Sequence, residues 1–204
     1  DELLALQLEI QRRRQRLQAL ARGLPCASDH HLIKPFLKQL GFALTDAQTR
    51  VLREIRRDLS RREPMRRLLQ GDVGSGKTVV AACAALMALE SGYNAALMVP
   101  TEILAEQHFE TFRRWFGPLE VKVCLRTGSR KTSNETDPLL RPASLGHRPA
   151  PRLTVGTHAL IEDGFAPEQL GLVIIDEQHK FGVVQREQLV RKGHYPHLLV
   201  MTAK

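Results

Sequence analysis

The eight residues GDVGSGKT, at positions 71–78, join the apolar run RRLLQ at 66–70 to the longer apolar run VVAACAALMAL at 79–89. Their glycines, lysine and threonine have the spacing of a phosphate-binding loop between a buried strand and a buried helix. Glycines allow a tight curve that turns backbone N–H groups inward, and the start of a helix adds partial positive charge. The alternative is a glycine-rich turn that caps a core helix. The matching strand and helix on either side favour the nucleotide interpretation.

This interpretation assigns a role to every residue of the loop. We expect ATP to be held by Gly71, Asp72, Val73, Gly74, Ser75, Gly76, Lys77 and Thr78. Lys77 would reach the β- and γ-phosphates, and the hydroxyl of Thr78 would bind Mg²⁺. The apolar run LVII ends at Asp176, which we expect to hold the same Mg²⁺. Glu177 is then placed to polarise the attacking water as general base. Two acidic residues after a strand often form only a solvated turn, but beside a phosphate-binding loop they indicate catalysis.

Strand-like runs alternate with helical patterns along the chain. The runs are RRLLQ (66–70), AALMV (95–99), VKVCL (121–125), LTV (153–155), LVIID (172–176) and HLLVM (197–201), with helices after the first two. Continuous apolar strands separated by helices predict an α/β fold in which a parallel sheet is covered on both faces.

Three further segments carry local signals. A short helix is expected over 33–40, and Thr45 is expected to cap a helix with Val51, Leu52, Ile55 and Leu59 on one face. The polar segment 126–151 contains four prolines, which predicts a mobile surface loop with at most one short helix, near Leu139.

Composition limits the class of protein. The chain has 204 residues and a net charge of +8, of which residues 1–67 carry +7 from 15 basic and 8 acidic side chains. Such a basic front favours an acidic polymer as partner, although its arginines also suit the solvated face of a helix. The three cysteines are widely spaced, which indicates a reducing cytosol and no metal site built from cysteines. No apolar stretch is long enough to span a membrane.

Polar clusters follow each of the later strands. They are Pro100-Thr101-Glu102, Thr127-Gly128-Ser129, Gly156-Thr157-His158, Asp176 to His179, and Thr202-Ala203. In open parallel sheets ligands bind beyond the carboxyl ends of the strands. One edge of the sheet is therefore expected to be the functional surface. It has more polar positions than a nucleotide needs, which predicts a second, extended ligand.

Five motifs in order make the sequence similar to a known family. They are RLLQGDVGSGKT, MVPTEILAEQH, VGTHALI, VIIDEQHKFGVVQR and MTA. Together they resemble the first motor lobe of the RecG family of ATP-dependent DNA helicases, in helicase superfamily 2. DELLALQLE at the start resembles the helical connector of that family.

The resemblance implies a RecA-like P-loop NTPase lobe at residues 42–204, preceded by a helical connector at residues 1–41. It implies an ATP hydrolase coupled to DNA unwinding or translocation, which remodels stalled forks and Holliday junctions in recombination and repair. We expect the chain to be a fragment, with the second motor lobe and the strand-splitting wedge domain absent, and to be weakly active or inactive alone. The family also implies a monomeric motor in the bacterial cytoplasm, near the nucleoid and replication-fork proteins.

The resemblance also places residues. Gln48 matches a glutamine that reads adenine, although it has capping-box spacing with Thr45 as well, and both roles stay open. His179 matches a residue that senses nucleotide and joins Lys77, Asp176 and Glu177 as catalytic, while Thr202 and Ala203 belong to a coupling segment. Positions along the DNA backbone are Pro100, Thr101, Glu102, Thr127, Gly128, Gly156 and Thr157.

Some residues depart from the family. Lys180 stands where arginine is common, and Lys204 replaces a threonine of the coupling motif.

A transcription-repair coupling type of translocase is the nearest alternative, and Gln178 argues against it. A nucleotide-switched protein-binding module and a DNA-binding fragment with a silent nucleotide site are the other two interpretations.

Overall fold

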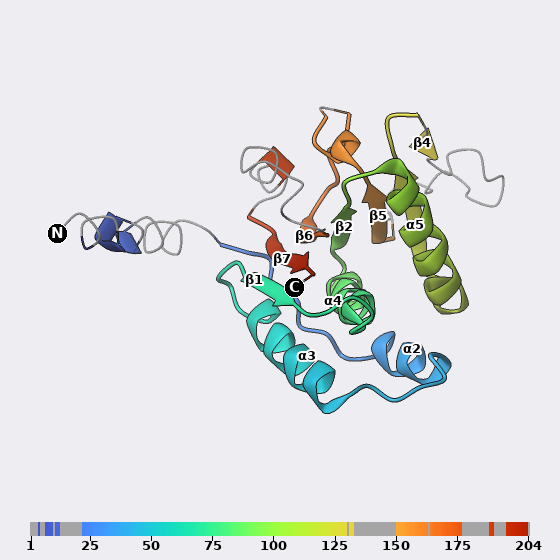
Figure 1. Ribbon diagram of the computed structural model, residues 1–204, viewed down its shortest axis with the longest axis horizontal. Coiled ribbons are helices and arrows are strands. Elements are labelled where there is room, and N and C mark those ends of the chain that lie inside the picture. The colour runs from blue at the N-terminus through green and yellow to red at the C-terminus, as the bar shows by residue number, and fades with distance from the viewer. Residues whose placement is uncertain are drawn as a thin grey trace.

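The computed structural model describes residues 4, 7–9, 11–12, 22–129, 131–132, 150–162, 164–176, 188–189 and 195–203. These residues form a seven-stranded sheet with the strand order β1-β7-β6-β2-β5-β3-β4 (Figure 1). The strands are β1 (Arg66–Gln70), β2 (Asn94–Met98), β3 (Lys122–Arg126), β4 (Lys131–Thr132), β5 (Arg152–Gly156), β6 (Leu170–Ile175) and β7 (His197–Thr202). All neighbouring pairs are parallel except β3 and β4. The predicted α/β fold with a parallel sheet is confirmed.

Two details differ from the sequence-based expectation. β4 lies inside the segment 126–151 and pairs antiparallel with β3, whereas only a loop with a short helix was predicted there. The helix expected near Leu139 lies outside the described residues. β1 was predicted as a buried strand but is the edge strand, with alternating exposed and half-buried residues and a Leu68 side chain that is 57% exposed. The run of leucines does not reveal that β1 has one neighbouring strand instead of two.

Four described helices follow the predicted pattern: α2 (Ile33–Gln39), α3 (Asp46–Leu59), α4 (Lys77–Glu90) and α5 (Glu102–Phe116). Short 3₁₀ turns lie at η1 (Gly117–Leu119) and η3 (His158–Leu160). α3 begins with the expected Thr45 cap and buries Leu52, Ile55 and Leu59. Residues 79–89 of α4 are all buried, which explains why their sequence is apolar all round.

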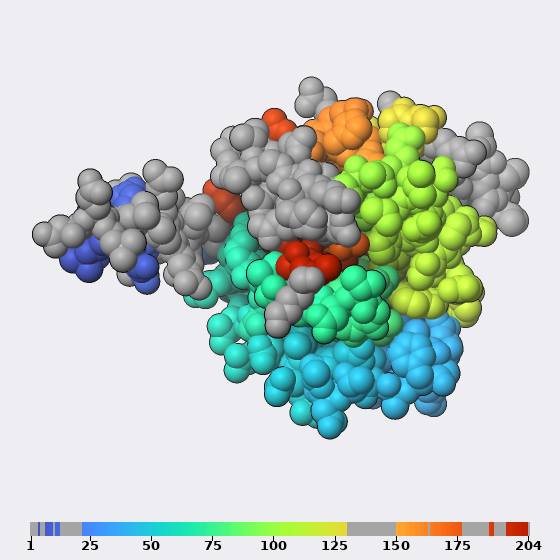
Figure 2. Space-filling view, in the orientation of Figure 1, coloured from blue at the N-terminus to red at the C-terminus, as the bar shows by residue number. Residues whose placement is uncertain are grey.

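Both faces of the sheet are covered by apolar packing. α2, α3, α4 and α5 join one large core with alternate residues of the central strands, and a smaller cluster around Phe165 and Leu160 covers the other face. Figure 2 shows α2 and α3 side by side along the lower part of the lobe, with α5 next to α2. Phe36 of α2 makes edge-on ring contacts with Trp115 and Phe116 of α5.

Residues 22–41, expected as the end of the connector, share the core of the lobe. Cys26, Ile33 and Phe36 are buried in the large cluster, and the N–H of Cys26 donates to the carbonyl of Leu59 at 2.8 Å. At the start of α2 the backbone N–H groups of Leu32 and Ile33 donate to the carboxylate of Glu90, at 2.5 and 2.9 Å. Glu90 therefore caps α2 from the end of α4, and the segment is fixed at both ends.

The three cysteines are free, and burial raises the pKa of the Cys26 and Cys83 thiols to about 12. Both are therefore thiols of the core, poorly suited to act as nucleophiles. Within the described part of the chain, no helix is long and apolar enough to cross a membrane.

His197, at the start of β7, joins three segments that are distant in sequence. Its ring is fully buried, its Nδ1 accepts from the N–H of Met65 at 2.9 Å, and its Nε2 lies 2.9 Å from the carbonyl oxygen of Leu24. This pair of bonds fits the neutral ring, with the proton on Nε2. Burial lowers the pKa of His197, and the bond to Leu24 opposes that shift.

We predict that His197→Gln removes a pH dependence of folding. The pKa of His197 is lower in the folded chain than its ordinary value of about 6.5. The neutral ring therefore contributes its full stabilisation of the folded chain above that pH. This stabilisation is lost as pH falls below about 6.5, since only the unfolded chain then binds the proton. Urea unfolding of both proteins from pH 8 to pH 5 should show the stability gap narrowing as the pH falls. A gap that is constant with pH would contradict this role.

Candidate nucleotide and nucleic-acid site

The glycine-rich loop has the strand–loop–helix setting expected from its sequence. It leaves β1 at Gly71, turns through Gly74 and Gly76, both at φ +80°, and enters α4. The carbonyl of Gly76 accepts the N–H groups of Val79 and Val80 at 3.0 and 3.3 Å, which starts the helix. Left-handed backbone at these two positions favours glycine, because a Cβ would crowd the following carbonyl. The loop thereby presents its backbone and the positive end of α4 to the same point.

Lys77 folds back over this loop. Its ammonium group donates to the carbonyl oxygens of Gly71 at 2.8 Å and Asp72 at 2.7 Å. Neutral carbonyls are weaker acceptors than anionic oxygens, so a phosphate within reach would compete successfully for these donors. Thr78, the next residue, is half-buried at the first turn of the helix. The loop residues Val73, Gly74 and Ser75 are exposed around it.

Gln48 contacts both the cap of α3 and the glycine-rich loop. Its side-chain oxygen accepts from the N–H of Thr45 at 2.9 Å, and its own N–H donates to the Thr45 hydroxyl at 3.2 Å, which completes a capping box. Its Nε2 donates to the carbonyl of Ser75 in the glycine-rich loop at 3.0 Å. The capping role of Gln48 is confirmed. Its recognition of adenine stays a prediction, and its side chain lies against the glycine-rich loop.

The strand order divides the functional edge into two halves. β1, β7 and β6 end at the glycine-rich loop, Thr202 and Asp176, so the residues predicted to hold nucleotide lie on three adjacent strands. The N–H of Gly71 donates to the carbonyl of Thr202 at 3.4 Å, which joins the coupling segment to the loop. β2, β5 and β3 end at the residues predicted to lie along DNA.

Asp176 lies at the boundary between these halves. Its N–H donates to the carbonyl of Met98 on β2 at 2.9 Å. Its Oδ2 is 3.1 Å from Nε2 of His108 on α5, and the two side chains are only 17% and 14% exposed. His108 is the last residue of the motif MVPTEILAEQH, but the sequence alone suggests no role for it, because its partner Asp176 is 68 residues away. The fold therefore adds a residue that fixes one oxygen of the predicted metal carboxylate.

Glu102 connects two of the predicted DNA-contacting clusters. Its carboxylate accepts the hydroxyl of Ser129 at 2.7 Å and the N–H of Ser129 at 3.1 Å. These bonds, with smaller contributions from Gly128 and Thr127, lower the pKa of Glu102. A carboxylate repels phosphate, so these contacts suit a residue that holds the 127–129 turn in place for others. Thr101 likewise uses its hydroxyl locally, accepting from the N–H of Leu104 at 3.3 Å as the cap of α5.

The threonine side chains at the ends of β3 and β5 point inward. Thr127 and Thr157 are each 1% exposed, and among the described residues the Thr157 hydroxyl has no hydrogen-bond partner. A Cβ on Gly156 would lie 2.2 Å from the carbonyl oxygen of Arg126, so the backbone there needs glycine. At these turns the two threonine hydroxyls are buried, whereas Gly128 is exposed. A phosphate would therefore reach the backbone more easily than the hydroxyls.

The remaining predicted residues are distributed as follows. Glu177, Gln178, His179, Lys180 and Lys204 lie outside the described residues. Pro100 is half-buried next to Thr101, and Ala203 is half-buried after Thr202. Of the residues predicted to hold Mg²⁺, both the Thr78 hydroxyl and the Asp176 carboxylate belong to the part of the chain that the structure describes. Hard oxygen ligands of this kind fit Mg²⁺.

Comparison with known proteins agrees with the motifs. The family model of DEAD/DEAH box helicases matches residues 45–203. Over its whole length the chain is 51% identical to the ATP-dependent DNA helicase RecG of Acidithiobacillus ferridurans and 48% identical to that of Synechocystis sp.. It spans 29% and 24% of the length of these two relatives.

A solved structure of RecG bound to a three-way DNA junction is also similar. Its TM-score is 0.79 and its identity is 41%, over 99% of this chain and 26% of that chain. The resemblance that the five motifs indicate, and the RecA-like character of the lobe, are confirmed.

We predict that alanine at Gly76 destabilises the protein more than alanine at Gly74. Both positions have φ +80°, so each change should cost about 1–2 kcal/mol for left-handed backbone. Only at Gly76 would the new Cβ lie 2.3 Å from Nε2 of Gln48, whereas at Gly74 it meets nothing within 4 Å. Denaturant unfolding measures the difference.

The extra cost at Gly76 should shrink in a Gln48→Ala background, since the crowding atom is then gone. A double-mutant cycle with no coupling between Gly76 and Gln48 would contradict the contact between α3 and the loop.

Proposed function

The chain belongs to the DEAD/DEAH box helicase family, and on that basis we propose that it is the ATP-binding first motor lobe of a helicase that remodels branched DNA. Stalled forks and Holliday junctions are the proposed substrates, in recombination and repair. The observation that carries the proposal is the shared edge of the sheet, where three adjacent strands end at nucleotide-type residues and three at residues suited to a phosphate backbone. The relatives named RecG support DNA as the partner.

The geometry of the glycine-rich loop supports the proposal that the chain binds ATP. The backbone N–H groups of the glycine-rich loop and of the start of α4, apart from that of Gly71, which is bonded to Thr202, are proposed to hold the phosphates. Lys77 would exchange its bonds to the carbonyls of Gly71 and Asp72 for bonds to β- and γ-phosphate oxygens. The ammonium is charged in both states, but phosphate oxygens are charged acceptors and carbonyl oxygens are neutral, so the exchange adds Coulombic attraction. Gln48, already bonded to the loop at Ser75, is placed to contact the base.

Hydrolysis needs the acidic motif beside the loop. Thr78 and Asp176 are proposed to hold Mg²⁺, which would supply positive charge to offset the charge that develops on the phosphates. His108 would donate from Nε2 to one oxygen of Asp176 and fix the orientation of the other. Glu177 is proposed to take a proton from the attacking water as general base, and His179 to sense the nucleotide. Thr202, bonded to the first residue of the loop, would carry the change to the coupling segment with Ala203.

DNA is proposed to lie across the other half of the edge. Pro100, Thr101, Gly128 and Gly156 are the positions proposed to contact phosphates, with Glu102 and the buried Thr127 and Thr157 holding their turns. Contacts to phosphate position a strand without reading its bases, which suits a motor that moves along any sequence. Because the chain spans 24–29% of its two relatives, the complete motor is proposed to include a second lobe and a wedge domain.

The setting of the motor is also a proposal. We place it in the bacterial cytoplasm at the nucleoid, working as a monomer close to replication-fork proteins. The bacterial sources of the relatives support this placement.

Lys77→Ala should abolish ATP binding and leave the fold intact. The half-buried side chain makes its two bonds to exposed or half-buried loop carbonyls, so its removal costs little stability. Calorimetry measures the ATP affinity. Turnover of the wild-type chain is expected to be slow, because arginines from a second lobe are worth about 10³ to 10⁵ in rate in related phosphate chemistry. Forked DNA should raise this turnover in the wild type alone.

Two results would contradict the proposal. ATP affinity that is unchanged in Lys77→Ala would remove the nucleotide assignment. ATP binding and turnover that are both indifferent to DNA, at any salt concentration, would favour a nucleotide-switched protein-binding module.

His108→Ala should weaken Mg²⁺ binding and leave metal-free ATP binding unchanged. Loss of a partner that orients a metal-binding carboxylate typically costs about tenfold to a hundredfold in metal affinity. The readout is the Mg²⁺ concentration that half-saturates ATP binding in calorimetry, which does not depend on turnover. His108→Gln, which can still donate to Asp176, should recover part of the loss. Equal Mg²⁺ dependence in wild type and His108→Ala would show that the contact has no positioning role.

A further inference from the structure

The charges of α3 are separated onto two sides of the helix. Glu54 and Asp58 face the sheet, where Arg67 of β1 binds both, at 2.8 and 2.7 Å. The outward side carries four exposed arginines: Arg50, Arg53, Arg56 and Arg57. Since Glu54 and Asp58 are engaged by Arg67 of β1, the outward side of the helix keeps its positive charge.

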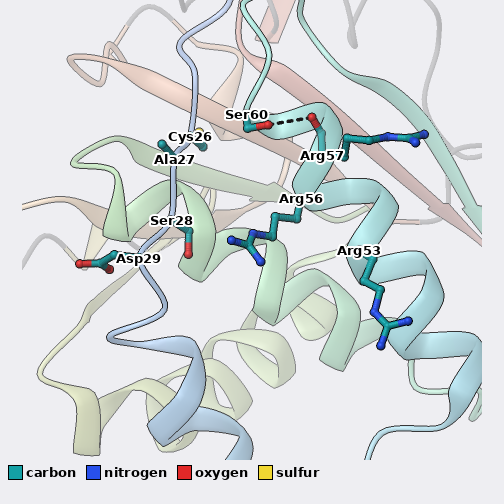
Figure 3. A pocket seen from close by; sticks show the side chains of 8 residues that line it. All are labelled: Cys26, Ala27, Ser28, Asp29, Arg53, Arg56, Arg57 and Ser60. Atoms are coloured by element: carbon teal, nitrogen blue, oxygen red, sulfur yellow. Dashed lines mark hydrogen bonds between the residues drawn. The ribbon is translucent and has the colours of Figure 1, made fainter.

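These arginines border a cavity. A hollow of about 490 Å³ lies between α3 and the extended segment 26–29, with Arg53, Arg56 and Arg57 on the helix side. Figure 3 shows that the Arg56 side chain reaches from α3 toward the extended segment, while Arg57 points away from it. A second hollow of about 260 Å³ is lined mostly by apolar side chains, and Arg53, Arg56 and Lys34 of α2 also border it. We call these two hollows the arginine groove.

The carboxylates near the groove have partners other than Arg53 and Arg56. Among the residues that the structure describes, no carboxylate forms an ion pair with either arginine. Asp29 is bonded to His31 at 2.5 Å, and Glu90 is bonded to Ser28 and to the N–H groups that it caps at the start of α2. Guanidinium groups are weakly hydrated and bind phosphate oxygens through two parallel N–H bonds. The groove is therefore built for a polyanion.

The groove is separate from the strand edge. α3 starts at the glycine-rich loop, where Gln48 contacts Ser75, and Arg53 and Arg56 are seven and ten residues further along the helix. At 1.5 Å per residue this is roughly 10–15 Å from the start of α3. A DNA arm that follows the strand edge would not fill the groove.

We propose that the arginine groove binds the phosphate backbone of a second duplex arm of branched DNA. The proposal rests on the proposed function, since branched DNA supplies a second arm where linear duplex has one. An acidic protein segment is the other polyanion that could reach the groove. DNA is favoured because the edge of the same lobe is already assigned to it and because planar guanidinium forks match phosphate.

The test compares a three-way DNA junction with linear duplex of equal length. Fluorescence anisotropy gives the dissociation constant of each DNA between about 50 and 200 mM salt. When the logarithm of affinity is plotted against the logarithm of salt concentration, every neutralised phosphate contributes about 0.9 to the slope. Arg53→Gln/Arg56→Gln should lower the slope for the junction by about 1.8 and leave the slope for linear duplex unchanged. ATP turnover without DNA should also be unchanged, since neither arginine belongs to the nucleotide site.

Two variants serve as controls. Arg113→Gln/Arg114→Gln removes the same charge from exposed positions of α5 and should leave both slopes as in the wild type. Arg53→Lys/Arg56→Lys keeps the charge and should retain most of the junction slope, which separates loss of charge from loss of folding.

An Arg53→Gln/Arg56→Gln protein with the wild-type junction slope overturns the groove proposal, and so does an equal loss in the α5 control. If DNA still stimulates Lys77-dependent turnover in that case, the proposed function stands without the groove. If the wild-type chain neither binds the junction nor responds to it, the proposed function fails and the groove proposal fails with it.

Discussion

The parallel pairing of six strands is the constraint on which the site depends. It places the carboxyl ends of β1, β7, β6, β2, β5 and β3 at one edge in that order. The glycine-rich loop, Thr202 and Asp176 therefore become neighbours, although they are distant in sequence. Residues 79–89 of the buried helix α4 pack between the sheet and α3. A change that shifted this helix would move the loop that begins it.

Contact between the two halves of the edge occurs at Asp176. Its backbone is bonded to β2 and its side chain to His108 on α5, the helix whose first residues form part of the proposed DNA surface. Glu102, at the start of the same helix, holds the turn after β3. Because a helix is rigid, a movement of α5 by bound DNA would be felt at Asp176. This short path provides a physical route by which DNA could alter nucleotide chemistry, with no change elsewhere in the lobe.

Much of this could be predicted from the sequence, for reasons that the structure makes clear. The phosphate-binding loop, the six parallel strands and the cap at Thr45 depend on local patterns, which a sequence displays directly. His108 could not be assigned, because its role arises only when α5, packed against β3 and β5, brings it to Asp176 at the end of β6. Successive side chains of a strand point to opposite faces, and the strand register decides which of them are buried. The burial of Thr127 and Thr157 therefore depends on register. The position of β1 at the edge likewise depends on strand order. The acidic motif beyond Asp176 stays a prediction, since Glu177 and His179 lie outside the described residues.

The most direct test of the account is the thermodynamic coupling between the two halves of the edge. The affinity for forked DNA should be measured with and without Mg-ATP, and the affinity for Mg-ATP with and without forked DNA. The account predicts that each ligand changes the affinity for the other by the same factor, as linkage requires, and that this factor differs from one. Typical coupling lies between about 5-fold and 150-fold. Tight binding of both ligands with a factor of one would mean that the halves are independent, and the central claim would be wrong.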